Sequence, residues 1–401
     1  MTKMIKMSLI AAVAVTGMTS AASAQNLEDA IKGVDVSGYV DYRLENRSYE
    51  ATPASNFNVN EYAVRVNLKS KVNDQVTANL SVGFDEVQTD NTNSGGSSVT
   101  IAQDANPSLN VVNAYFTANL GSTVVMAGKQ NIPSVFVDKV DTVKTGAGVV
   151  VLQPVNNNLT VAAAHFINNN IATVYALAST PATDTKTSEF IAMGNVANVD
   201  YALHYNYTDL GGIHGGTTTD HTFAKLGTKI QGVALTAKYA HGSTSSVDAT
   251  TWADASVAQL IASGKIGDVT LTGAYAKADK VKGSNGAQSD VALDADNDAD
   301  VHLKVWQAST QTIANKGDVM ALTVAMPILN NVTASLTYAA AKDKGVGTAH
   351  DTDYTETLAQ LTYAMSKNFT IHARYSMLTK DNTGNGDVDT NYSRLAIKYT
   401  F

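Results

Sequence analysis

The chain has 401 residues and no cysteine, which excludes a disulfide framework and a thiolate metal site. Its formal charge of −8 argues against nucleic-acid binding, because such proteins need a basic face. Beyond the N-terminal segment there is no apolar run of about 18 residues, so a transmembrane helix is also excluded.

The first 24 residues have the pattern of a secretory signal peptide. Lys3 and Lys6 form a basic start, Met7–Val15 forms a short apolar core, and Ala22-Ser23-Ala24 fits the small-residue rule for cleavage before Gln25. Removing the two lysines of this segment changes the formal charge from −8 to −10. We therefore take residues 1–24 as a signal peptide and interpret the rest as the mature chain.

From Val34 onward, segments of about ten residues alternate strictly between apolar and polar side chains. In the first segment, Val34–Glu45, one face is apolar and the other carries Asp41, Arg43 and Glu45. Asn60–Ser70 and Gln75–Glu86 repeat this alternation, and later segments around 332–338 and 369–375 are as regular. A period of two predicts β-strands, because successive side chains point to opposite faces.

The breaks between the predicted strands alternate between short and long. Short turns are expected at Lys71–Asp74, Leu120–Gly121, Pro154–Asn157, Ala197–Asn198, Gln231–Gly232, Gly267–Asp268, Pro327–Asn331 and Ser366–Lys367. Long polar connections are expected at Val87–Ser108, Asn168–Lys186, Ser243–Ser256, Lys280–Gly317 and Thr379–Thr390. Short periplasmic turns that alternate with long external loops are typical of bacterial outer-membrane barrels.

These patterns predict an all-β fold, a transmembrane antiparallel β-barrel of about 18 strands. The alternation is blurred in Leu109–Asn119, Gly148–Gln153 and Val257–Ile266, so a barrel of 16 strands is an alternative. A soluble β-sandwich is the alternative fold, but the charged residues that recur on one face favour the barrel. The last strand ends at Phe401 with apolar residues at every second position, as in the signal that barrel-assembly machinery recognises.

The chain resembles the major outer-membrane porin family of ε-proteobacteria. The resemblance is carried by LEDAIKGVDVSGYVDYRLE (Leu27–Glu45), by Ala127–Gln130, by Thr145–Val151 and by Asn158–Ala163, and it continues beyond as pattern and spacing. It implies an eighteen-stranded barrel over residues 34–401, a short periplasmic helix over 25–33, a homotrimer and a third loop folded inward. The external loops after residue 168 do not match the family.

The segment Asn131–Thr145 follows the fifth strand and is expected to be the inward-folded third loop. It carries Asp138 and Asp141 beside apolar residues that can pack against the barrel wall. Lys129, at the end of the preceding strand, is included among the expected pore-lining residues. An ordinary surface loop is the alternative reading.

Four arginines are predicted to form a positive stripe inside the pore: Arg43, Arg65, Arg374 and Arg394. They lie on the first two and last two strands, which become neighbours when a barrel closes, and a guanidinium stays charged at any relevant pH. Asp41, Glu45 and Glu61 are expected nearby. The hypothesis is that the stripe faces Asp138 and Asp141 across a constriction; the alternative is a salt-bridged wall that only stiffens the barrel.

Other candidate sites are weak. The run Asp290–Asp300 opens like an EF-hand, but Ala299 and Val305 stand where glycine and glutamate are required, so at most a loose Ca²⁺ contact is expected. The eight histidines include no metal-binding pair, although His204 and His372 can face the lumen. Nothing places a nucleophile beside a base, so we expect no enzyme, no metal site and no cofactor.

The sequence therefore predicts a porin in the outer membrane of a double-membraned bacterium. It is expected to let ions and small hydrophilic solutes diffuse passively, with a mild preference for cations at the mouth. Its expected partners are outer-membrane lipid, lipopolysaccharide and two further copies of itself. A substrate-specific channel on the same barrel, and a surface adhesin or structural outer-membrane protein, are the alternatives.

Overall fold

The computed structural model describes residues 33–49, 57–91, 109–137, 144–169, 185–209, 218–245, 253–280, 300–306, 308, 316–344, 351–382 and 387–401. The predicted signal peptide and all but the last residue of the expected helix at 25–33 lie outside these ranges. No helix of the described part of the chain is long and apolar enough to cross a membrane.

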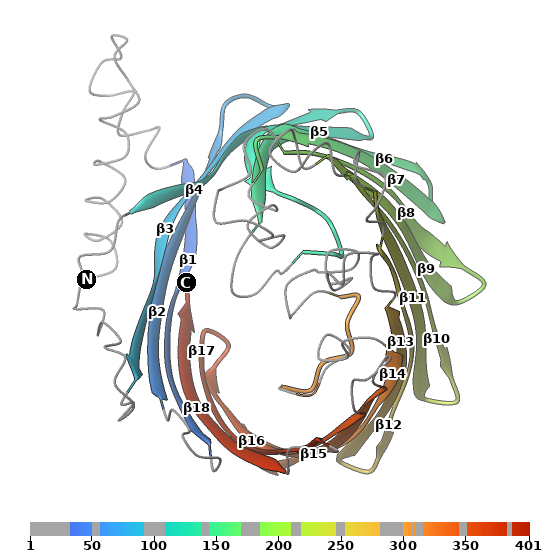
Figure 1. The fold of residues 1–401 in the computed structure, drawn as a ribbon. Coiled ribbons are helices and arrows are strands. Elements are labelled where there is room, and N and C mark those ends of the chain that lie inside the picture. The colour runs from blue at the N-terminus through green and yellow to red at the C-terminus, as the bar shows by residue number, and fades with distance from the viewer. Residues whose placement is uncertain are drawn as a thin grey trace, which may run out of the picture.

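Eighteen antiparallel strands form one closed barrel (Figure 1), which confirms the predicted fold class and favours 18 strands over 16. The strands are β1 (Val34–Tyr49), β2 (Phe57–Lys71), β3 (Val76–Asn91), β4 (Asn110–Leu120), β5 (Thr123–Asn131), β6 (Thr145–Asn156), β7 (Leu159–Ile167), β8 (Lys186–Val196), β9 (Val199–Asp209), β10 (Thr218–Ile230), β11 (Val233–Ser245), β12 (Ala253–Ile266), β13 (Val269–Lys280), β14 (Lys316–Leu329), β15 (Val332–Lys344), β16 (Thr352–Ser366), β17 (Phe369–Asn382) and β18 (Val388–Thr400).

The barrel closes where β1 pairs with both β2 and β18. At this seam the backbone N–H of Gly38 donates to Phe401 and the N–H of Phe401 donates back to Gly38, each at 3.0 Å. A Cβ atom at Gly38 would meet the Phe401 ring and the Arg65 carbonyl, so only glycine fits there.

The two faces of the barrel are reversed relative to a soluble protein. On β1, Val40, Tyr42 and Leu44 point outward with 43%, 41% and 41% of their surface exposed, whereas Asp41 and Glu45 on the inner face are buried. An apolar exterior around a charged interior is the arrangement that a lipid-spanning barrel requires.

Two-residue turns join the strands at the end of the barrel predicted to be periplasmic. At Ala197-Asn198 φ is 51° and 64°, and at Gln231-Gly232 it is 49° and 86°. Positive φ at both positions is the type I′ geometry that matches the twist of paired strands. Two expected turns need correction, because β6 continues through Pro154 and β14 through Pro327, with a bulge in the register directly after each proline.

One side of the barrel interior is packed with apolar side chains. Small or apolar residues on the inner faces of β10 to β15 form one cluster with two segments that fold into the lumen, residues 132–137 after β5 and residues 300–306 after β13. Both coloured segments lie inside the ring of strands in Figure 1. The cluster comprises Val135, Phe136, Phe223, Ala240, Ala255, Val257, Ala276, Ala278, Val301, Leu303, Val319 and Ala341.

The second inward segment corrects the prediction that Lys280–Gly317 is an external connection throughout. Val301, Leu303 and Trp306 are buried, and the side-chain amide of Gln259 on β12 donates to the Val301 carbonyl at 2.5 Å. The inner faces of β13 to β15 are rich in alanine, and this leaves room for the segment inside the barrel.

The reversed faces give a test of the fold in lipid. Leu336 on β15 points outward and is 54% exposed, so Leu336→Arg should lower the free energy of unfolding in lipid vesicles by about 2–4 kcal/mol. Ser335→Arg places the same side chain on the lumen side one residue away and should cost much less. Equal losses for the two variants, measured by urea unfolding, would contradict the assigned faces.

Candidate pore constriction

Barrel closure brings the four predicted arginines onto one inner wall. Arg65 on β2 lies opposite Tyr39 on β1, and Arg374 on β17 lies opposite Arg394 on β18. Arg394 in turn lies opposite Glu45 on β1, two residues along from Arg43. Residues more than 300 positions apart in the sequence thus share one surface.

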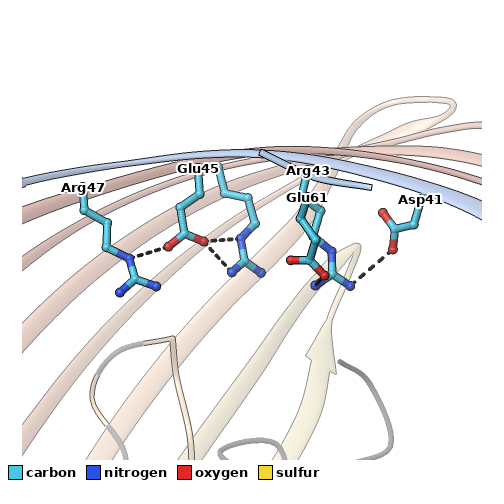
Figure 2. A network of polar contacts seen from close by, with 6 residues as sticks. Asp41, Arg43, Glu45, Arg47 and Glu61 are labelled. Atoms are coloured by element: carbon cyan, nitrogen blue, oxygen red, sulfur yellow. Dashed lines mark hydrogen bonds and ion pairs between the residues drawn. The ribbon is translucent and has the colours of Figure 1, made fainter. Parts of the chain in front are cut away.

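The acidic residues of this wall are bound between the arginines (Figure 2). Arg43 donates to Asp41 at 3.2 Å and to Glu61 at 3.5 Å. Glu45 accepts from Arg47 at 2.6 Å and from Arg394 at 2.5 Å. Asp41 and Glu45 are nearly fully buried, so their charges are stabilised by these pairs rather than by water.

Two further basic residues of the wall were not among the expected pore-lining set. Arg47 lies two residues beyond the predicted end of the first strand, which the structure extends to Tyr49. Lys398 on β18 lies 4.0 Å from Asp41 and over the ring of Tyr39, with its nitrogen 4.6 Å from the centroid. Arg47 and Lys398 both occupy alternate positions whose side chains face the lumen. Continuing the apolar–polar alternation along β1 and β18 would therefore have predicted both as pore-lining residues.

The segment after β13 faces this wall. The Trp306 ring packs against Tyr392 with centroids 5.9 Å apart, and the guanidinium of Arg394 lies 5.4 Å from the centroid of Trp306. The carboxylate of Glu356 on β16 fixes the segment, because it accepts the backbone N–H of Ala308 at 2.7 Å and that of Trp306 at 3.4 Å. Glu356 is fully buried and also accepts from the Ser376 hydroxyl at 2.7 Å.

The space between wall and segment is a cavity of about 390 Å³. Its lining is basic and aromatic, formed by Asp41, Arg43, Lys304, Val305, Trp306, His372, Arg374, Arg394, Ala396 and Lys398. Three of the four predicted arginines thus line one cavity, together with a loop that the sequence did not point to.

The predicted third loop folds inward, but its described part lies against a different wall. The ring of Phe136 packs against His221 of β10 in a tilted arrangement with centroids 4.8 Å apart, and it meets Phe223 edge-on at 6.5 Å. The loop closes on itself where the N–H of Ile132 donates to the carbonyl of Lys144 at 3.0 Å. Asp138 and Asp141 lie outside the described residues, so their placement opposite the arginines stays a prediction.

Among the expected pore-lining residues that the structure describes, Lys129 does not turn its side chain to the lumen. The next residue on β5, Gln130, is buried inside the barrel. Because successive side chains of a strand point to opposite faces, Lys129 points outward. Its ammonium donates to the Val111 carbonyl at 2.6 Å. We therefore leave Lys129 out of the constriction.

Both histidines expected to face the lumen do so. His204 Nδ1 lies 3.0 Å from the buried carboxylate of Glu189, and His372 contacts the hydroxyl of Thr362 at 3.1 Å. Within the described ranges no three or more His, Asp or Glu side chains are grouped so that they could hold a metal ion. Of the acidic run at 290–300, only Asp300 belongs to the described residues.

Comparison with known proteins places the chain among outer-membrane proteins. Residues 2–401 match the family described as Campylobacter major outer membrane protein. No curated protein sequence matches the chain. Among solved structures, OccAB1 of Acinetobacter baumannii superposes with a TM-score of 0.66 at 12% identity, covering 92% of this chain and 96% of that one. OccK5 (OpdH) of Pseudomonas aeruginosa superposes with a TM-score of 0.62 at 12% identity, covering 92% and 98%. At such identities the likeness shows the fold alone.

Proposed function

Because the chain belongs to the Campylobacter major outer membrane protein family and is an outer-membrane porin, we propose that ions and small hydrophilic solutes diffuse passively through its lumen. The observation that carries this proposal is the charged cavity inside the closed barrel, narrowed by the segment 300–306. In a channel of this kind the constriction sets the size limit and its fixed charges act on passing ions.

We also propose a mild preference for cations at the external mouth. The acidic run Asp290–Asp300 and the net charge of −10 without residues 1–24 support it, since acidic groups at an entrance raise the local concentration of cations. The cavity at the seam has the opposite charge, so the proposed preference belongs to the entrance and not to the constriction.

Processing and assembly are part of the same proposal. The basic, apolar and small-residue pattern of residues 1–24 supports removal of a signal peptide on export. The family resemblance supports a homotrimer, and the apolar outer face supports contact with outer-membrane lipid and lipopolysaccharide. We propose no catalytic step and no cofactor.

Single-channel recording in planar bilayers tests the proposal. The refolded protein should give stable conductance steps that scale with bulk salt. In asymmetric KCl, a reversal potential of cation-selective sign would support the preference at the mouth, and one of anion-selective sign would show that the positive constriction outweighs it. A protein that inserts without conducting would point instead to an adhesin or structural role. Saturation of the current by one solute would point to a substrate-specific channel.

A further inference from the structure

A second cavity, of about 330 Å³, lies inside the barrel between the segment 132–137 and the strand wall. The segment packs on β6 and β7 through Ile132 and Val137, and on β10 through Val135 and Phe136. The wall of this second cavity comes from β5 to β10, and most of the side chains that line it are apolar. It is therefore distinct in place and in chemistry from the basic cavity at the seam.

Small side chains on the inner face of the barrel leave this space open. Ala162, Ala164 and Ala202 line the second cavity at positions where longer side chains would fill it. Met193, on the inner face of β8, is apolar and yet 38% exposed. Protein interiors are close-packed, and apolar surface left open commonly marks a ligand site. An apolar cavity of about 150 Å³ is already large enough to bind benzene, so this one has room for a substituted ring.

A nearly buried histidine gives the second cavity one polar group. His204 lines it from β9, and only 8% of the side chain is exposed. Its Nδ1 lies 3.0 Å from the fully buried carboxylate of Glu189, which also accepts from the Asn206 amide at 2.5 Å. Because a carboxylate only accepts, Nδ1 carries the proton, and Nε2 of the neutral ring is an acceptor. No described residue bonds to Nε2, so the acceptor is available to the cavity that the ring lines.

The other groups of the second cavity suit an aromatic and uncharged ligand. Phe223 offers a ring, and Met126 and Met193 offer thioethers, which make favourable contacts with aromatic rings. Lys225 and Asp300 also line the cavity, and both are exposed. Their charges are of opposite sign, so the lining favours neither an anion nor a cation.

We infer that the second cavity is a binding site for small uncharged aromatic solutes that carry one hydrogen-bond donor, such as phenols. The ring of the solute lies among Met126, Met193 and Phe223, and its hydroxyl donates to Nε2 of His204. This inference goes beyond passive diffusion, because it names a class of solute that the lumen retains. Ion conduction does not require such a site, so the two proposals can fail separately.

4-Fluorophenol tests the site, because its fluorine NMR signal reports binding without any ion current. With the barrel folded in detergent, the signal should broaden in a saturable way, beyond the broadening caused by empty micelles. 4-Fluoroanisole has the same ring but no donor, and it should bind roughly fivefold more weakly. Equal affinity for the two probes, or broadening no greater than in empty micelles, would overturn the inference. Binding by a barrel that does not conduct would support the site and contradict the channel.

Cavity-filling variants locate the binding. Ala162→Phe places a ring inside the second cavity and should weaken the binding of 4-fluorophenol about tenfold. Ala192→Phe makes the same change on the outer face of β8, next to the buried Ile191, and should alter the affinity by less than about twofold.

A smaller change keeps the test decisive if Ala162→Phe does not fold. Ala202→Leu fills part of the second cavity from β9 and should weaken binding roughly threefold. Unchanged affinity in the folded cavity variants, or an equal loss in Ala192→Phe, would show that 4-fluorophenol binds elsewhere and would overturn the assignment.

Discussion

Replacing Glu356 by alanine should widen the pore and raise the single-channel conductance roughly twofold, since the conducting width is set by the narrowest constriction. The buried carboxylate anchors the end of the segment that carries Trp306, through the backbone N–H groups of Trp306 and Ala308. Without it, two N–H groups inside the barrel lose their acceptor, at a cost of about 1–3 kcal/mol each. We expect the segment to leave the wall rather than keep those groups unsatisfied.

Two controls separate release of the segment from general weakening of the barrel. Glu356→Gln keeps one carbonyl oxygen as an acceptor and should give a smaller increase in conductance than Glu356→Ala. Glu189 on β8 is equally buried but binds His204 and Asn206 on the other side of the lumen, so Glu189→Ala should not enlarge the cavity beside Trp306. Unchanged conductance in Glu356→Ala would show that the carboxylate does not hold the constriction.

Glu45→Gln should lower the free energy of unfolding by about 3–5 kcal/mol, because breaking a buried ion pair leaves an uncompensated charge. Glu45 is nearly fully buried and binds two guanidinium groups, those of Arg47 and Arg394. Loss of its charge also leaves the inner wall more positive, so the reversal potential should shift toward anions. Urea unfolding in vesicles and asymmetric-salt recordings measure the two effects.

Glu61→Gln is the matched control on the neighbouring strand. The side chain of Glu61 is more exposed and makes its ion pair with Arg43 at the longer distance of 3.5 Å, so the loss of stability should be much smaller. In a double-mutant cycle, adding Arg394→Gln to Glu45→Gln should recover part of the stability. If Glu45→Gln and Glu61→Gln cost the same, burial of Glu45 would not explain its role.

The barrel itself could be predicted because its signal is repeated along the whole chain. Alternation in Val34–Glu45 and the short turns recur often enough that local errors, such as the turns expected at Pro154 and Pro327, do not change the topology. That Arg43, Arg374 and Arg394 lie close together could be predicted from closure of the barrel. Closure makes their strands neighbours, and the alternation of side chains places all three on the inner face.

The packed side of the lumen could not be predicted in the same way. β6 and β12 lack a clean polar face because Val150 and Val257 pack against the inward segments instead of facing water. In sequence this packing appears only as blurred alternation and as a run of inner-face alanines on β13 to β15. Which loop fills the space depends on contacts between residues far apart, such as Gln259 with Val301.

The seam between β1 and β18 has a consequence for biogenesis. Its partners lie at opposite ends of the described chain, so closing the ring there joins segments far apart in sequence and carries a large entropic cost. Until then two long edges with open hydrogen-bonding groups are available to any other strand, and this makes the unclosed intermediate prone to aggregation. An assembly factor that covers either edge would therefore protect the chain during the interval before the cylinder is sealed.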